Sequence, residues 1–149
     1  MDANPKECVF VSACLLGAEC RYDGKSKPRS EAIEMLGQYV CIPICPEQMG
    51  GLTTPRPKSH LTDGDGRAVL AGKAKVVTGD GRDVTAQFLK GASESLRLAK
   101  LYGVKRAFLK QRSPSCGYGM VKVIGERTAG IGVTAAALEA EGIEIVAVD

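Results

Sequence analysis

The chain has 149 residues, of which 44% are hydrophobic and 25% charged, as in an ordinary globular protein, and we expect residues 1–149 to fold as a single domain. Its net charge of +3 is small, so it permits an anionic substrate or a nucleic acid without requiring either. The apolar stretch Val9–Leu16 is too short for a signal core or a membrane span, which argues against a secreted or membrane protein and favours the cytosol.

The N-terminal half of the chain predicts two strands joined by a short helix. The runs Cys8–Cys14 and Tyr39–Cys45 are almost continuously apolar, as in strands that are buried on both faces of a parallel sheet. Between them, Arg29–Gln38 has the pattern of a short helix. In residues 61–82, two clusters of Gly and Asp flank an apolar run, and we expect a hairpin-like excursion there.

The C-terminal half predicts two further pairs of a helix and a strand. Asp83–Tyr102 is the clearest helix, because its apolar residues recur at helical spacing and a glycine follows it directly. A strand is expected at Val104–Lys110, a small second hairpin at Met120–Gly130, a helix at Val133–Glu141 and a last strand at Ile143–Val148. This order of elements predicts an α/β fold, a three-layer Rossmann-like domain with a mainly parallel sheet and small hairpin excursions.

The six cysteines carry the most functional information. In a reducing cytosol such a number indicates buried thiols, a metal site or catalysis more than disulfides. Cys8 and Cys41 lie inside predicted strands and are expected to be core thiols, whereas Cys20 lies in a loop and is not expected to be a ligand. Cys14 and Cys45 end the first two strands, and Cys116 follows the third.

Ligands of open parallel sheets bind beyond the carboxyl ends of the strands, so Cys14, Cys45 and Cys116 are expected to converge. Three thiolates suit either a catalytic Zn²⁺ with an open position or a 4Fe–4S cluster in which one iron lacks a protein ligand. None of the three has the short spacing that is usual at such sites, and the residues alone do not choose iron over zinc.

Several long motifs resemble those of the family of domains of unknown function that includes the thiouracil desulfidases. The resemblance covers nearly the whole chain and keeps the order of the motifs. These are SACLLG at 12–17, CRYDG at 20–24, CPEQMGGL at 45–52, PRP at 55–57, GRDVT at 81–85 and LKQRSPSCG at 109–117.

The resemblance implies a 4Fe–4S cluster held by Cys14, Cys45 and Cys116, with the open iron binding the sulfur of a thiocarbonyl substrate. It implies that 2-thiouracil or 4-thiouracil becomes uracil and sulfide without net oxidation. It also implies an acid/base pair at Glu47 and Ser113. Without the resemblance, Glu47 is as well explained as a cap of a helix that starts after Pro46, and Ser113 as a cap of a turn.

Two other functions stay open at this stage. Desulfidation of 4-thiouridine in nucleotides or tRNA is one, since Arg21, Arg56, Lys110 and Arg112 flank the cysteine motifs. We rate nucleic acid below a small thiolated pyrimidine as the partner, because basic and aromatic residues do not interleave. The other is a non-catalytic module that binds a metal or an Fe–S cluster. His60, the one histidine, is expected in a loop without a catalytic role.

Overall fold

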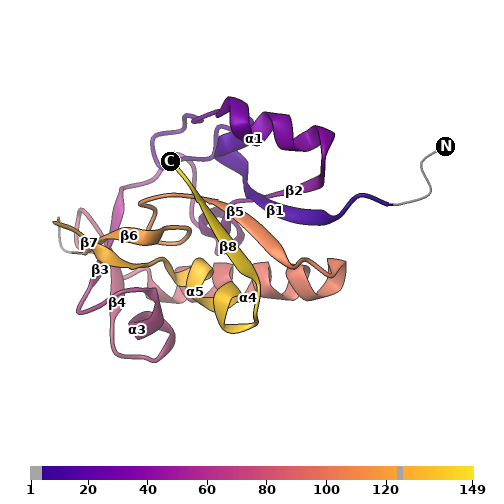
Figure 1. Cartoon of the computed structure of the whole chain (residues 1–149). Helices are drawn as coiled ribbons and strands as arrows, with labels where there is room; N and C mark the ends of the chain where they lie inside the picture. Colours follow the sequence, from indigo (N-terminus) through magenta and orange to yellow (C-terminus); the bar gives the residue numbers. More distant parts are fainter. Residues whose placement is uncertain (1–4, 124–125) are drawn as a thin grey trace.

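The computed structural model describes residues 5–123 and 126–149. Its centre is a sheet of four parallel strands in the order β2-β1-β5-β8. The bounds are Cys8–Ser12 for β1, Val40–Ile44 for β2, Arg106–Lys110 for β5 and Glu144–Val148 for β8. Helix α1 covers one face, and α4 and α5 cover the other (Figure 1). The predicted α/β fold with a parallel sheet is therefore confirmed.

Strand β1 shows how the apolar runs build the two interfaces of this sheet. Successive side chains of a strand point to opposite faces. Val9 and Val11 accordingly pack with Ala32 of α1, which spans Ser30–Glu34 and continues as the 3-10 helix η2 at Met35–Gly37. Phe10 points to the other face and belongs to the core that includes Ala99 and Ala135. Because β1 is buried on both faces, its sequence is apolar throughout.

Strand β2 differs from its prediction, because it forms an edge of the sheet. Its residues are mostly half-buried or exposed, and Val40 keeps 48% of its surface. Its apolar sequence did not reveal this position, since an edge strand lacks a neighbour on one side. Both β1 and β2 also end earlier than predicted. Residues Ala13–Leu16 form the 3-10 helix η1, and Pro46 begins the short helix α2 at Pro46–Met49.

The two predicted excursions join into a second sheet of four strands, in the order β4-β3-β6-β7. Its strands are β3 at Ser59–Thr62, β4 at Lys75–Thr78, β6 at Tyr118–Val123 and β7 at Glu126–Ile131. The pairs β3–β4 and β6–β7 are antiparallel, and β3 runs parallel to β6. The expected second hairpin is thus confirmed, although its residues 124–125 lie outside the described residues. His60 lies in β3, so its prediction as a loop residue was wrong.

The excursion over residues 61–82 holds a helix that the turn signals concealed. Helix α3 spans Gly66–Leu70, and the carboxylate of Asp65 accepts hydrogen bonds from the backbone N–H groups of Arg67 and Ala68. An aspartate in this position is a favourable N-cap. The Gly and Asp residues that predicted a turn therefore start a helix, and the prediction of a plain hairpin was wrong.

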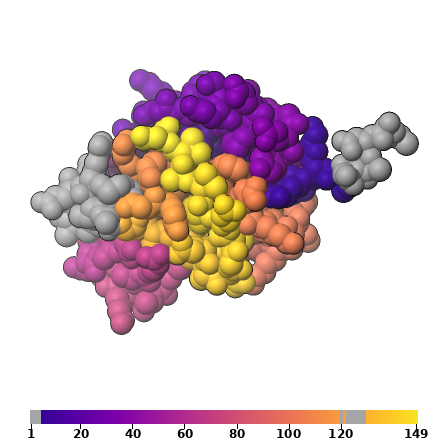
Figure 2. Space-filling view, viewed as in Figure 1, coloured from indigo at the N-terminus to yellow at the C-terminus, as the bar shows by residue number. Residues whose placement is uncertain are grey.

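Two helices tie the sheets together. Helix α4 spans Thr85–Tyr102, and Gly103 ends it with a φ of 64°. Its Phe88 packs into the core of the second sheet, whereas Ala99 belongs to the core of the first. Helix α5 spans Val133–Ala140 and contributes to both cores in the same way. The space-filling view shows the yellow C-terminal segment packed between the purple N-terminal part and the magenta segment (Figure 2).

No helix in the described part of the chain combines the length and the apolar composition that a membrane crossing needs.

Candidate active site

A cavity of about 260 Å³ lies where the carboxyl ends of the first sheet face the second sheet. Its wall includes Ser12 from the end of β1, Ile44 from the end of β2 and Lys110 from the end of β5. The start of β3 contributes Ser59. The cavity therefore occupies the position at which open parallel sheets place their ligands.

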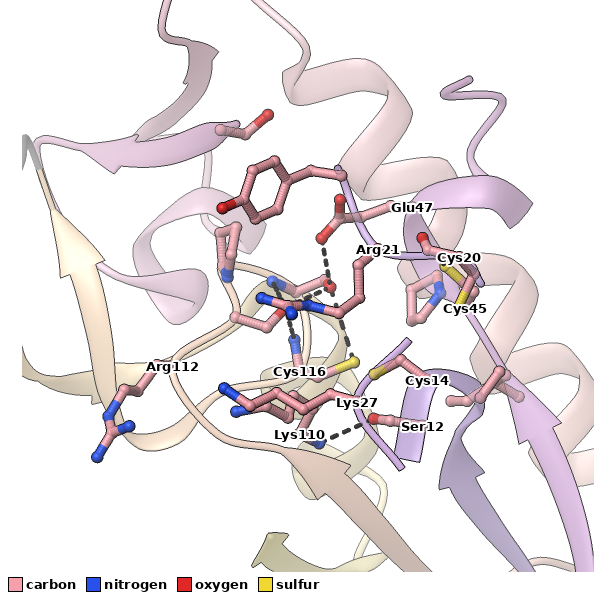
Figure 3. A pocket seen from close by; sticks show the side chains of 18 of the residues that line it. Ser12, Cys14, Cys20, Arg21, Lys27, Cys45, Glu47, Lys110, Arg112 and Cys116 are labelled. Atoms are coloured by element: carbon pink, nitrogen blue, oxygen red, sulfur yellow. Dashed lines mark hydrogen bonds between the residues drawn. The ribbon is translucent and has the colours of Figure 1, made fainter. Parts of the chain in front are cut away.

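The three cysteines that the sequence singled out all line this cavity (Figure 3). Cys14 lies in η1 and Cys45 immediately precedes α2, so each lies just beyond a strand and does not end it as predicted. Cys116 lies in the loop between β5 and β6. The expected convergence is therefore present, while the role of these thiols as ligands stays a prediction.

A fourth thiol, Cys20, lies in the same wall, where the sequence analysis expected no ligand. A hydrogen bond from Cys20 lowers the pKa of Cys14. The side-chain contact with Cys20, together with burial, raises the pKa of Cys45, whose thiol also donates to the Cys20 carbonyl oxygen at 3.7 Å. Burial raises the pKa of Cys116 to about 12. Cys14 is consequently the thiol that becomes a thiolate most readily.

The donor set fits a cluster bound through several irons. All six cysteines are free thiols. In residues 5–123 and 126–149, no three His, Cys, Asp or Glu side chains are grouped closely enough to hold a single metal ion. A cubane cluster asks less of them, because each thiolate binds its own iron at a separate corner. Hydrogen bonds reach the Cys45 sulfur from the Gln48 backbone and the Cys116 sulfur from Ser115, and such donors stabilise thiolates.

Glu47 is held beside the cysteines by a buried ion pair. Its Oε2 accepts a hydrogen bond of 2.7 Å from Nε of Arg56, and the two side chains are only 14% and 5% exposed. Arg56 also donates to the carbonyl oxygens of Cys20 and Thr53 and to Oγ1 of Thr54. Helix α2 has no side-chain cap, so the capping role considered for Glu47 is not the one it has in the structure.

Ser113 is connected to Glu47 through a second serine. Oγ of Ser113 accepts hydrogen bonds from the backbone N–H groups of Ser115 and Cys116, at 3.2 and 3.1 Å, so it does cap the turn. It also lies 3.0 Å from Oγ of Ser115, which donates to Oε1 of Glu47 at 3.3 Å. The sequence analysis missed Ser115, although its place beside Cys116 in the SPSC motif was a signal for it.

The cavity has a strongly positive wall. Glu47 is the one acidic residue among the described residues that line it, and Arg56 neutralises it. Arg112 pairs with Asp149 at 2.9 Å, and burial lowers the pKa of Lys110. The basic residues in the wall are Arg21, Lys27, Arg56, Lys58, Lys110 and Arg112. His60 is not part of the wall.

The model of the 2-thiouracil desulfurase family matches residues 9–149 of the chain. The chain belongs to this family. The resemblance inferred from the motifs is therefore confirmed. Among the relatives of this desulfurase family member is an uncharacterized protein of Bacillus subtilis, YbbK, which is 38% identical over 141 residues and is covered to 93%, as is the present chain.

A solved structure gives the same relationship in three dimensions. It is described as the [4Fe-4S]-dependent thiouracil desulfidase TudS and is 40% identical in sequence. It superposes on this desulfurase family member with a TM-score of 0.79, over 95% of the present chain and 91% of the TudS chain. At this identity the likeness extends beyond the fold to the family.

In this member of the desulfurase family, helix α2 carries Glu47 and follows Cys45, and its position depends on a glycine of α4. A Cβ on Gly91 would lie 2.0 Å from the carbonyl oxygen of Pro46. We expect Gly91→Ala to push α2 away and to lower the stability of the protein by about 1–3 kcal/mol, as overpacking does. The change should also cost most of the cluster-binding capacity. Thermal unfolding and iron analysis measure the two effects.

The control for this variant is Lys90→Ala, one residue earlier on the exposed side of α4. It makes the same residue in the same helix without a backbone clash, so the unfolding temperature and the iron content should stay close to wild type. An unchanged Gly91→Ala protein would show that α2 tolerates a displacement from α4.

Proposed function

We propose that this chain binds a 4Fe–4S cluster through Cys14, Cys45 and Cys116 and removes sulfur from thiouracil, giving uracil and sulfide. The observation that supports it best is the single cavity that collects these three thiols with Glu47 and Ser113. The cluster itself comes from the similarity to TudS, whose description names it. Bound at these thiolates, it would supply a soft Lewis acid, an iron free to take the thiocarbonyl sulfur.

The protein residues would handle water and protons. Oε2 of Glu47 is occupied by Arg56, whereas Oε1 accepts only the 3.3 Å hydrogen bond from Ser115 and can take a proton from water. The water oxygen then adds to the ring carbon, the carbon–sulfur bond breaks, and the carbon keeps its oxidation state. Glu47 thus acts as the general base.

Ser113 would act as the proton donor. Its Oγ already accepts two backbone N–H groups, so its own hydrogen is the part left to donate. It can reach Ser115 or the ring nitrogen or sulfur of the substrate. The proton taken up at Glu47 returns through Ser115 and Ser113, so that one water supplies the carbonyl oxygen and the protons of the product.

Purification without oxygen tests the proposal directly. We expect iron and acid-labile sulfide in about a 1:1 ratio, as in a 4Fe–4S cluster, and sulfide release from 2-thiouracil or 4-thiouracil. A protein reconstituted with iron and sulfide that desulfurates no thiolated pyrimidine would refute it. One zinc and no iron would instead favour a non-catalytic binding module. A cytosolic location, expected from the free thiols, stays a prediction.

A second substrate class is favoured by the charge of the cavity. Lys58 Nζ and Arg21 Cζ lie 5.4 and 5.7 Å from the ring centre of Tyr22, so two cations flank one aromatic side chain in the wall. This arrangement suits the phosphate of a 4-thiouridine nucleotide or of tRNA. Turnover of base, nucleoside, nucleotide and tRNA under identical conditions decides between them, since a phosphate preference would vanish at high salt.

A further inference from the structure

Ser59 presents an unusual hydroxyl group at the cavity. The residue lines the cavity from the start of β3 and is only 6% exposed. Its Oγ is shielded from solvent and has no hydrogen-bond partner among the residues that the structure describes. Two other buried polar atoms share this condition, Nε of Arg29 and Oγ1 of Thr134, but neither residue lines the cavity.

The place of Ser59 in β3 would suit an apolar side chain. Strand β3 alternates, so that Ser59 and Leu61 are buried while His60 and Thr62 are half-buried. Leu61 packs in an apolar core with Val76. A hydroxyl at the end of this buried row costs free energy as long as nothing pairs with it. Stability therefore does not explain the serine, and a ligand that enters the cavity does.

The backbone of Ser59 is held firmly. Ser59 pairs with Thr78 in the β3–β4 ladder, and Gly79 donates a hydrogen bond of 2.9 Å to the carbonyl oxygen of the preceding Lys58. Rotation about its Cα–Cβ bond is the main freedom left to the side chain. The hydroxyl can therefore turn toward a ligand at little entropic cost, which is what a selective contact requires.

The proposed function identifies the ligand group that this hydroxyl can meet, and the inference rests on that function. Thiouracil carries a thiocarbonyl group and, elsewhere on the ring, a carbonyl group that the reaction leaves intact. The sulfur must face the cysteines at the edge of the first sheet, whereas Ser59 belongs to the second sheet. We propose that the Ser59 hydroxyl donates a hydrogen bond to this unreacting carbonyl oxygen and so selects oxo-thiopyrimidines.

The test is Ser59→Ala with two substrates. Loss of one hydrogen bond between neutral groups should raise KM for 4-thiouracil about five- to tenfold and leave kcat within about twofold. The dissociation constant for the product uracil, measured by calorimetry, should rise by the same factor without any turnover. Pyrimidine-4-thione lacks the carbonyl oxygen, so the wild type and the variant should bind it equally.

Thr134→Val is the matched control. It removes another buried hydroxyl without a partner, from α5 and away from the cavity, and should leave KM unchanged. Neither variant should lower the unfolding temperature, because neither hydroxyl is paired within the protein.

Equal KM and uracil affinity in wild type and Ser59→Ala would overturn the inference, as would an equal loss with both substrates. If wild-type protein releases no sulfide from any thiopyrimidine, the proposed function fails instead. Uracil binding still tests Ser59 in that case.

Discussion

Cys116→Ala is expected to abolish both the bound cluster and sulfide release. Cys116 is 5% exposed and lies in the loop that also carries Ser113 and Ser115. The cavity offers no other thiol from that loop, because the remaining cysteines of the wall come from the N-terminal part of the chain. Iron and sulfide content, with visible absorbance of protein prepared without oxygen, measures the loss.

Two matched variants separate a ligand from a bystander. Cys41→Ala removes a half-buried thiol of β2 that lies outside the cavity wall, and it should keep the cluster. Cys20→Ala removes the thiol that contacts Cys14 and Cys45, and it should also retain iron if three ligands suffice. Full iron content in Cys116→Ala, or loss of iron in Cys20→Ala, would show that the ligand set is different.

Glu47→Gln is expected to lower kcat by about 10²–10⁴-fold, the contribution of a general base. The amide keeps an oxygen for Arg56 Nε, so the variant should fold and should retain its iron. It cannot take a proton from water at the position of Oε1. Sulfide release at saturating substrate, compared with iron content and unfolding temperature, isolates the chemical step.

Glu139→Gln is the control for the change from carboxylate to amide. Glu139 also accepts a hydrogen bond of 2.7 Å from an arginine, Arg67, but lies in α5 outside the cavity wall. Its kcat should equal that of wild type. A Glu47→Gln protein with nearly normal turnover would place the base elsewhere, and turnover in neither protein would favour a non-catalytic module.

The site could be anticipated because it follows a general rule of topology. Cys14, Cys45 and Cys116 all follow predicted strands of one parallel sheet, and the carboxyl ends of such strands meet at one edge. The details of the acid/base network could not be anticipated. Ser115 was overlooked because its hydroxyl acquires a role only through its 3.3 Å contact with Glu47, 68 positions away in the chain.

Local sequence by itself determined the elements whose signals are local. The apolar run of β1, the helical periodicity of α4 and the glycine at its end each depend on neighbouring residues, so the parallel α/β core was predicted. The tertiary structure alone decided that β2 is an edge and that Leu61 of β3 pairs with Val123 of β6, which unites two excursions into one sheet. It alone placed the Ser59 hydroxyl at the cavity. Such facts depend on partners distant in the chain, and no local periodicity records which partner is chosen.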